Sequence, residues 1–438
     1  MIALPSSPLV IHWFRRDLRW NDNRALHAAL SSGHRVLLLF VFDENILQHL
    51  EDKQDARVTF LHNRMSVLQK EAKTMGSDIY VAHGTPHDVL LELIAKLDVR
   101  GVYANEDYEP YALGRDGLLM EALSAKNTPL HTFKDHVIKA PGEVVKPDGT
   151  PYTVFTPFSK RWHANLTEDD LEASPSEQHL DQLAKWQHKG MPSLQEMGFT
   201  PSDVAIPEAN VEPQLLKHYA ETRDTPSVRG TSRVSVHLRF GTVSIRNMAR
   251  QGFAHSEKWL TELIWRDFYQ SVMHAFPHSM KDAFRAKYDR IPWRHDDAHF
   301  AAWKEGKTGY PIVDAGMREL LATGFMHNRV RMVVASFFCK HLLMDWRLGE
   351  RHFAAHLLDF ELASNVGGWQ WAAGSGCDAA PYFRVFNPTS QLQKFDPDYA
   401  YVKRWVPEWG TSAYPQPMVD HKMARQRAID TYKEALTT

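Results

Sequence analysis

The sequence predicts an N-terminal α/β domain with a parallel, Rossmann-like sheet, a long connector, and a C-terminal domain made only of helices. Three observations support this fold class. Short apolar runs alternate with helical patterns over the first 135 residues, a polar and proline-rich stretch follows, and helical periodicity dominates from Pro213 onward. A chain of 438 residues can form two or three domains, each with its own core. We place the domain boundaries at 1–135, 136–213 and 214–438.

Five apolar runs predict the strands of the sheet. They cover Leu9–Phe14, Val36–Phe42, Ile79–Val81, Gly101–Ala104 and Leu130–Phe133. Helical patterns separate them at Arg24–Ser31, Val58–Thr74, Pro86–Leu97 and Tyr111–Ala125. Such alternation is typical of a parallel sheet covered on both faces. The glycine-rich phosphate-binding motifs of many such sheets are missing, so the sheet itself indicates no particular ligand.

Composition excludes several classes of protein. Charged residues make up 24% of the chain and hydrophobic residues 43%, which is typical of a globular protein rather than a disordered one. No apolar run reaches the roughly 18 residues of a membrane span, and the N-terminus has no secretory pattern. The two cysteines stand far apart, which favours neither a disulfide framework nor a metal site. We therefore expect a cytoplasmic protein without a metal ion.

The net charge of −2 conceals two unlike halves. Residues 217–438 carry a formal charge of +7, and residues 1–216 carry −9. Nine of the 13 tryptophans also lie after residue 200, where a large aromatic core is the simplest interpretation. A basic helical half is compatible with a polyanionic partner, although it does not establish one.

Polar residues interrupt the helical half in a way that indicates a ligand. The run Gly230–Ser235 combines small hydroxyls with Arg233, so it is either a phosphate seat or a plain helix cap. In the helix that follows, Glu262, Trp265 and Arg266 share one face, which fits either a planar ligand or a buried ion pair with an aromatic cover.

Two later segments repeat this pattern. Asn328, Arg331 and Met332 share a helical face, and Glu361, Asn365 and Trp369 follow at intervals of four residues. The glycines next to Trp369 allow either a close backbone approach or a helix end. Because buried polar groups need partners, these segments together predict one enclosed polar pocket.

Longer motifs resemble the photolyase/cryptochrome flavoproteins. The first is Trp13–Arg19 and the second is Thr308–Arg318. The third is Trp369–Trp371, which leads to Asp378–Arg384. The resemblance extends from about residue 8 to 435. Met326–Met332 further resembles class I cyclobutane pyrimidine dimer photolyases, and the two-histidine variant of (6-4) photolyases and animal cryptochromes is absent there.

The resemblance implies that the helical domain binds FAD. The residues that correspond to cofactor contacts are Tyr219, Thr231, Ser232, Val234, Ser235, Glu262, Arg266, Asn328, Arg331, Asp359, Glu361 and Asn365. Arg331 and Asp359 match the family's ion pair beside the isoalloxazine, and Asn365 matches the residue that faces flavin N5. Glu361 replaces an Asp of some members, so its carboxylate reaches further.

The implied reaction is light-driven repair of cyclobutane pyrimidine dimers in DNA. Excited FADH⁻ donates an electron to the dimer, the ring splits, and the electron returns. Glu262, Asn328 and Met332 match residues that contact the dimer bases, while Trp265 and Trp371 match stacking walls for a flipped lesion. Arg223, Arg329, Arg384 and Gln391 match positions near the DNA backbone. Trp293, Trp346 and Trp369 match the family's electron chain, which reduces the resting flavin.

Two questions stay open at this level. The α/β domain of the family often holds a second, antenna chromophore, and Tyr111-Ala112 stands where folate-binding members have Asn-Glu, which disfavours folate but leaves a deazaflavin or a flavin open. The rival functions are a cryptochrome-type photoreceptor without repair and a DNA-binding flavoprotein that has lost catalysis. Asn365 and the dimer-contacting residues favour a repair enzyme, which we expect to be monomeric.

Overall fold

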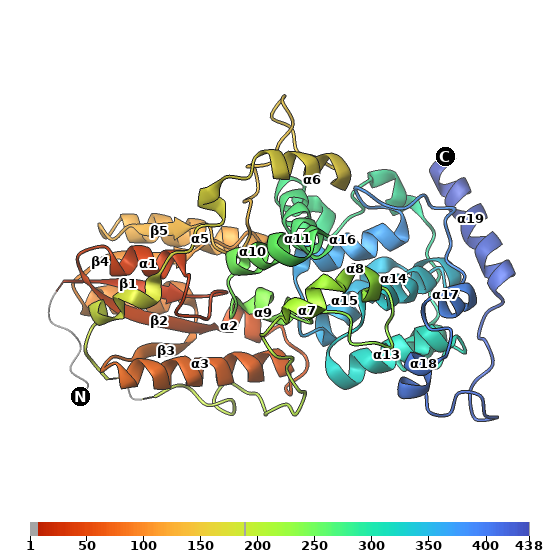
Figure 1. The fold of residues 1–438 in the computed structure, drawn as a ribbon, viewed down its shortest axis with the longest axis horizontal. Coiled ribbons are helices and arrows are strands. Elements are labelled where there is room, and N and C mark those ends of the chain that lie inside the picture. The colour runs from red at the N-terminus through yellow and green to blue at the C-terminus, as the bar shows by residue number, and fades with distance from the viewer. Residues whose placement is uncertain (1–7, 188–189, 438) are drawn as a thin grey trace. The chain divides into compact units, whose positions relative to one another are not determined.

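The computed structural model describes residues 8–187 and 190–437. The chain forms two compact units, each assembled from three separate segments (Figure 1). Unit 1 contains 1–140, 166–210 and 234–251, and unit 2 contains 141–165, 211–233 and 252–438. The three-way division predicted from the sequence stays a prediction. None of the described helices is both long and apolar enough to cross a membrane.

Unit 1 is built around a five-stranded parallel sheet. The strands are β1 (Leu9–Phe14), β2 (Arg35–Asp43), β3 (Ile79–Gly84), β4 (Val99–Asn105) and β5 (Leu130–Phe133). Their order across the sheet is β3-β2-β1-β4-β5, and every pair is parallel. The central strands are buried on both faces, which explains why the sequence shows continuous apolar runs there rather than alternation. The α/β prediction is confirmed, strand by strand.

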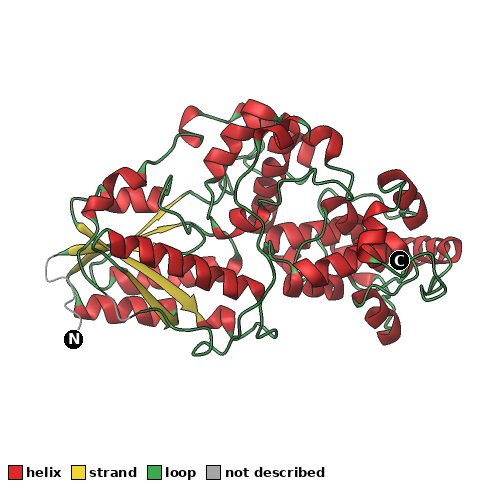
Figure 2. Ribbon diagram, turned by 60° about the horizontal axis from the view of Figure 1, so that its bottom comes forward, coloured by secondary structure: helices red, strands yellow, loops and turns green. Residues whose placement is uncertain are grey.

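Helices separate the strands, as Figure 2 shows by colour. They are α1 (Arg24–Leu30), α2 (Glu44–Leu47), α3 (Ala56–Thr74), α4 (Pro86–Lys96) and α5 (Pro110–Ser124). Unit 1 also holds the 3-10 turns η1 (Glu168–Asp170) and η2 (Ser176–Gln182), helix α9 (Ser235–Phe240) and most of α10 (Ile245–His255).

Buried ion pairs connect α10 to the loops that follow β1 and β5. Arg246 of α10 donates to Asp22 at 2.9 Å and to Asp135 at 2.7 Å, and Arg19 also pairs with Asp135.

Unit 2 consists of helices and loops over its described residues, with one isolated antiparallel bridge between Val145 and Pro151. Its helices are α6 (Phe155–Ala164), α7 (Pro213–Lys217), α8 (Tyr219–Thr222), α11 (Glu257–Ala275), α12 (Asp297–Lys304), α13 (Pro311–Thr323), α14 (Asn328–Ser336), α15 (Trp346–His356), α16 (Leu362–Ala373), α17 (Pro388–Phe395), α18 (Ala400–Trp405) and α19 (His421–Thr437). Short 3-10 turns lie at Pro277–Met280 (η3) and Ala286–Arg290 (η4), and one π-helical turn at Phe337–His341 (η5). The prediction of an all-helical C-terminal half is confirmed.

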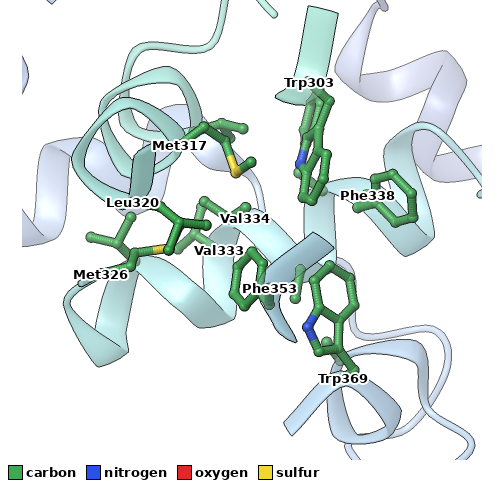
Figure 3. Close-up of a cluster of buried hydrophobic side chains, with 14 of the residues drawn as sticks. Trp303, Met317, Leu320, Met326, Val333, Val334, Phe338, Phe353 and Trp369 are labelled. Atoms are coloured by element: carbon green, nitrogen blue, oxygen red, sulfur yellow. The ribbon is translucent and has the colours of Figure 1, made fainter. Parts of the chain in front are cut away.

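The core of unit 2 is large and aromatic. Trp369 packs edge-on against Trp303, Phe338 and Phe353, with ring centroids 6.1, 5.7 and 4.9 Å away (Figure 3). Close helix packing depends on small residues. A Cβ at Gly316 would lie 2.4 Å from Val330, so α13 and α14 could not approach as they do with a larger residue. This packing fixes the helices that carry the predicted polar residues.

Candidate functional site

Helix α11 supplies the first buried charge of the site. The helix is capped by Ser256, whose hydroxyl accepts from the backbone N–H of Trp259. Ten residues further, the guanidinium of Arg266 is buried and donates to Glu361 Oε1 at 2.9 Å. Glu361 precedes α16, and its other oxygen accepts from the Ser364 hydroxyl at 3.4 Å. The pair therefore links α11 to the start of α16 with its charges balanced.

A second ion pair fixes helix α14. Arg331 Nη2 contacts both oxygens of Asp359, at 3.1 and 3.0 Å, and Arg331 Nε donates to the Met326 carbonyl at 2.7 Å. Three contacts from one guanidinium leave it little rotational freedom. The sequence comparison within the family predicted this ion pair, and the pair is present. Its position beside a flavin stays a prediction.

Asn365, on α16, is held in one orientation by a residue that the sequence analysis did not single out. Its Nδ2 donates to the Glu350 carbonyl at 3.1 Å and to Glu350 Oε1 at 2.8 Å. Since both amide hydrogens have acceptors there, the amide presents Oδ1, an acceptor, on its other side. Burial raises the pKa of Glu350. The sequence offered little indication that Glu350 is the partner of Asn365, because Glu350 lies on another helix, α15.

Arg223 and Glu262 form the most exposed of the three pairs. Their side chains are 16% and 31% exposed, and Arg223 also lies 5.3 Å from the ring centroid of Tyr219. Burial, aided by Glu262, raises the pKa of Tyr219, so its hydroxyl stays protonated. The structure thus brings together one predicted DNA contact, one predicted dimer contact and one predicted cofactor contact.

The hydroxyl run before α9 is a tight loop rather than a plain helix cap. The cap position of α9 is Val234, and no side chain caps the helix there. Ser232 Oγ instead accepts from Trp259 Nε1 at 3.2 Å, which leaves the hydroxyl hydrogen of Ser232 free to donate to an anion. A Cβ at Gly230 would lie 2.6 Å from Thr222, and Arg233 adopts a φ of +53°. Both facts show a loop that follows a constrained path.

The loop divides between the two units. Thr231 and Ser232 belong to unit 2, whereas Val234 and Ser235 belong to unit 1. The predicted diphosphate contacts of Val234 and Ser235 therefore stay predictions.

The start of α14 carries three of the predicted residues in different environments. Asn328, the first residue of the helix, is exposed, and Met332 is half-buried one turn later. Arg329 donates to Asp224 at 2.9 Å, and its Nη1 lies 3.8 Å from Met332 Sδ. His327 caps the helix by accepting the Arg329 backbone N–H at Nδ1. Its buried Nε2 has no partner among the described residues.

The two predicted stacking tryptophans, Trp265 and Trp371, lie in different surroundings. The ring of Trp265 stacks on Phe155 with centroids 3.6 Å apart and planes within 4°. A pocket, of about 410 Å³ including its open part, is lined by Tyr269, Gly367 and Trp371 among others. Trp371, one of the two predicted stacking residues, borders this pocket, while Trp265 has its face covered by Phe155.

The remaining predicted residues lie further apart. Arg384 is exposed, with its guanidinium 5.8 Å from the ring of Phe386, and Gln391 is half-buried on α17. Trp346 and Trp369 belong to one buried cluster of unit 2, and Trp293 packs against that cluster. Besides Glu350, the structure adds Asp224 and Phe155 as direct partners of predicted residues. Neither could be found by spacing, since each lies on a different element from its partner.

Comparison with known proteins decides the family. Residues 10–177 match the DNA photolyase family, and residues 259–412 match the FAD binding domain of DNA photolyase. A deoxyribodipyrimidine photo-lyase of Halobacterium salinarum is 37% identical over 97% of this chain and 99% of its own length. The chain belongs to the DNA photolyase family.

Solved structures of photolyases also share the whole fold. A class III photolyase from Agrobacterium tumefaciens aligns with a TM-score of 0.87 at 32% identity, covering 100% of this chain and 99% of its own. An archaeal photolyase from Sulfolobus tokodaii, described with two FAD molecules, aligns with a TM-score of 0.80 at 30% identity, covering 98% and 100%. The predicted family and fold class are therefore confirmed. Assignment to class I stays a prediction.

The side chains of unit 2 fit the cofactor of the family. An isoalloxazine offers both carbonyl acceptors and N–H donors, and the site supplies guanidiniums, carboxylates and the Oδ1 of Asn365. A diphosphate needs donors, and Ser232 keeps its hydroxyl hydrogen for one. The FAD binding domain of this photolyase family member thus has the donor and acceptor set that FAD requires.

Proposed function

We propose that this photolyase family member repairs cyclobutane pyrimidine dimers in DNA under blue light, with FAD as its cofactor. The proposal is carried by one observation. In unit 2, residues predicted to contact flavin, dimer or DNA backbone come from four separate segments and pair with one another, as Arg266 with Glu361, Arg331 with Asp359, and Arg223 with Glu262. Charges that served packing alone would not need to coincide with a family's ligand contacts.

Each part of the site has a role under this proposal. When bound, FAD supplies the light absorption and the electron exchange. Arg331 with Asp359, and Arg266 with Glu361, hold the cofactor in position, and Ser232 with Thr231 donates to its diphosphate. Asn365, fixed by Glu350, offers an acceptor at the reactive edge of the ring. The buried protein groups replace water around the cofactor.

The substrate contacts follow from the more exposed residues. Glu262, Asn328 and Met332 contact the bases of the dimer. Trp371, together with Trp265, one face of which Phe155 covers, forms the aromatic walls for a flipped lesion. Arg223, Arg329, Arg384 and Gln391 contact the backbone without reading the sequence. Electrons pass inward from half-buried Trp293 through buried Trp346 and Trp369. The basic charge of residues 217–438 favours this polyanionic partner.

The proposal has three further parts. The α/β unit holds a second chromophore, as a light-harvesting cofactor is described for the Sulfolobus tokodaii relative. The protein acts as a monomer in the cytoplasm. Within the family, the enzyme belongs to class I, on the basis of Met326–Met332.

The decisive experiment is repair of a dimer-containing oligonucleotide by the chemically reduced protein. We expect blue light to restore the undamaged pyrimidines, with no turnover in the dark and none on a matched (6-4) lesion. Repair of the (6-4) lesion instead would contradict the assignment of substrate. No repair of either lesion by FAD-loaded protein would favour the photoreceptor function.

A further inference from the structure

One carboxylate lies among the residues that the proposed function assigns to the DNA backbone. Asp224 follows α8, in a segment, 223–233, that holds three arginines and no other acidic residue. Its Oδ1 lies 2.9 Å from Nη2 of Arg329 and 3.9 Å from Nε of Arg223. Both arginines are predicted backbone contacts. A negative charge at this place weakens the attraction for a polyanion, and the proposed reaction makes no use of it.

The guanidinium of Arg329 is held in place by more than this carboxylate. Its Nη1 lies 3.8 Å from Met332 Sδ, and its Cζ lies 4.4 Å from the ring centroid of Phe395. Neither contact involves Asp224, so the guanidinium keeps its position when the carboxylate leaves. A planar guanidinium fixed in this way can bind a phosphate oxygen at the same N–H groups that now bind Asp224.

Asp224 is the more exposed partner in both contacts. Its side chain is 44% exposed, whereas those of Arg329 and Arg223 are 20% and 16% exposed. It also lies in a turn rather than inside a helix. An ion pair with so exposed a member is weak, and an incoming anion can replace the carboxylate without disturbing the packing beneath it.

We propose that Asp224 is a built-in competitor of the DNA phosphate at Arg329 and, more weakly, at Arg223. The inference rests on the proposed function. In the free protein the carboxylate occupies the guanidinium, and a backbone phosphate displaces it to make the predicted contact. No covalent bond changes, because Arg329 exchanges one anion for another and the freed carboxylate attracts a cation from the solvent.

The competitor limits attachment to undamaged DNA. Every DNA backbone meets the cost of displacing Asp224, since contacts to phosphates do not read the bases. Only a DNA with a dimer adds the base contacts that the proposed function assigns to Glu262, Asn328 and Met332, and these offset the cost. The protein therefore leaves undamaged DNA more readily than its arginines alone would allow.

Displacement of a carboxylate also affects the salt dependence of binding. Each phosphate that a protein neutralises releases about 0.9 cation from duplex DNA. In wild type, the cation that the freed Asp224 attracts offsets about one such release. Asparagine attracts none. Asp224→Asn should therefore bind DNA more tightly, and the plot of log K against log salt should be steeper by about 0.9.

The test measures DNA binding in the dark, by fluorescence anisotropy of a labelled duplex with the FAD-loaded protein. One duplex is undamaged and the other holds a thymine dimer. At about 50 mM salt, Asp224→Asn should bind each duplex about fivefold more tightly than wild type, which is the upper end for an exposed ion pair. The steeper slope should remove this gain at about 300 mM salt. The ratio of the two affinities should stay the same.

Glu221→Gln is the matched control. Glu221 lies three residues earlier, its side chain is 76% exposed, and its partner is His218 rather than an arginine. Loss of this negative charge should change the affinity for DNA by less than about 1.5-fold, because solvent and salt screen it. Equal gains in Glu221→Gln and Asp224→Asn would mean that only the net charge matters, and the competitor would be rejected.

A double-mutant cycle distinguishes displacement from simple repulsion of phosphate. In the background of Arg329→Gln, the main partner of Asp224 is gone. Adding Asp224→Asn there should strengthen binding by less than about twofold, which leaves room only for repulsion and for the weaker contact with Arg223. The full fivefold gain in that background would overturn the proposal.

The outcomes separate this inference from the proposed function. If Arg329→Gln weakens binding while Asp224→Asn changes neither the affinity nor the salt slope, the competitor is refuted and the DNA contact stands. If Arg329→Gln binds dimer-containing DNA as tightly as wild type, the predicted backbone contact is wrong, and Asp224 has no phosphate to compete with.

Discussion

Glu262 is the one side chain to which the proposed function gives both a cofactor contact and a dimer contact. Its carboxylate is half-buried on α11 and pairs with Arg223, which is itself a predicted DNA contact. A carboxylate with one partner still has acceptor sites for the N–H groups of a base. Arg223 thus holds this carboxylate in place in the absence of any ligand.

We predict that Glu262→Gln weakens binding of dimer-containing DNA by about tenfold or more, since a hydrogen bond to a charged group contributes about 1.5–3 kcal/mol. Bound FAD should be retained, because the buried pairs of the site are untouched. The measurement is a titration of the oligonucleotide, together with the flavin absorbance. Glu257→Gln, an exposed change on the same helix, is the matched control. Equal affinities in the two variants would argue against the contact.

At the scale of residues, sequence reasoning found the charged groups but few of their partners. The pair of Arg331 and Asp359 was predicted from the family and is present. The partner of Asn365, Glu350, was missed because a contact between two helices leaves no spacing in the sequence. The same holds for Asp224 beside Arg329. Spacing in the sequence predicts which residues share one face of a helix. It does not predict which residues of another helix contact that face.

At the scale of elements, α16 settles a question that the sequence left open. Gly367 and Gly368 lie inside the helix rather than at its end. A Cβ at Gly367 would lie 2.3 Å from the ring of Tyr269, whereas a Cβ at Gly368 would meet nothing within 4 Å. The first glycine therefore serves the close approach of α11 and α16, and the second does not.

These neighbours make a matched pair of variants. Gly367→Ala should destabilise the protein by about 1–3 kcal/mol, because the added methyl group forces the ring or the helix to move. Gly368→Ala should stabilise it by about 0.5–1 kcal/mol, because alanine restricts the unfolded chain and favours helix. Urea unfolding of both variants measures the difference. Changes of the same sign in the two variants would contradict this account.

The strands and most helices of unit 1 were predicted to within a few residues, because each buried strand is a continuous apolar run. Helix α6 was missed. Its apolar residues, Phe155, Phe158 and Trp162, are spaced for one helical face and are all buried. The surrounding turn residues and Pro157 concealed this pattern. Helix propensity was overridden here by packing, which the sequence shows only through the three aromatic positions.

At the scale of the whole molecule, buried histidines tie stability to pH. Burial lowers the pKa of His12 and His327 to about 4 and that of His341 to about 3. Unfolding exposes these rings and restores a pKa near 6.5. Between pH 6.5 and 4 the unfolded chain therefore binds more protons than the folded one, so acid favours unfolding.

We predict that the free energy of unfolding falls as the pH drops from 6.5 toward 4, by about 1.4 kcal/mol per pH unit for each such histidine. His327→Asn should reduce this slope by the contribution of one histidine, about 1.4 kcal/mol per pH unit. The side-chain amide of the new asparagine can still cap α14. Denaturant unfolding at several pH values gives the slope. His49→Asn, at an exposed site, should leave it unchanged. An unaltered slope in His327→Asn would rule out this contribution.

The interleaving of the two units has a consequence for biosynthesis. The chain passes from one unit to the other five times, and the last segment of unit 1 ends only at residue 251. Arg246, in that segment, neutralises the buried carboxylates of Asp22 and Asp135. On the ribosome, Asp135 already has Arg19 as a partner, but the carboxylate of Asp22 must wait for Arg246 until more than half of the polypeptide has emerged. The α/β unit can finish folding only when the first helices of its neighbour are already being synthesised.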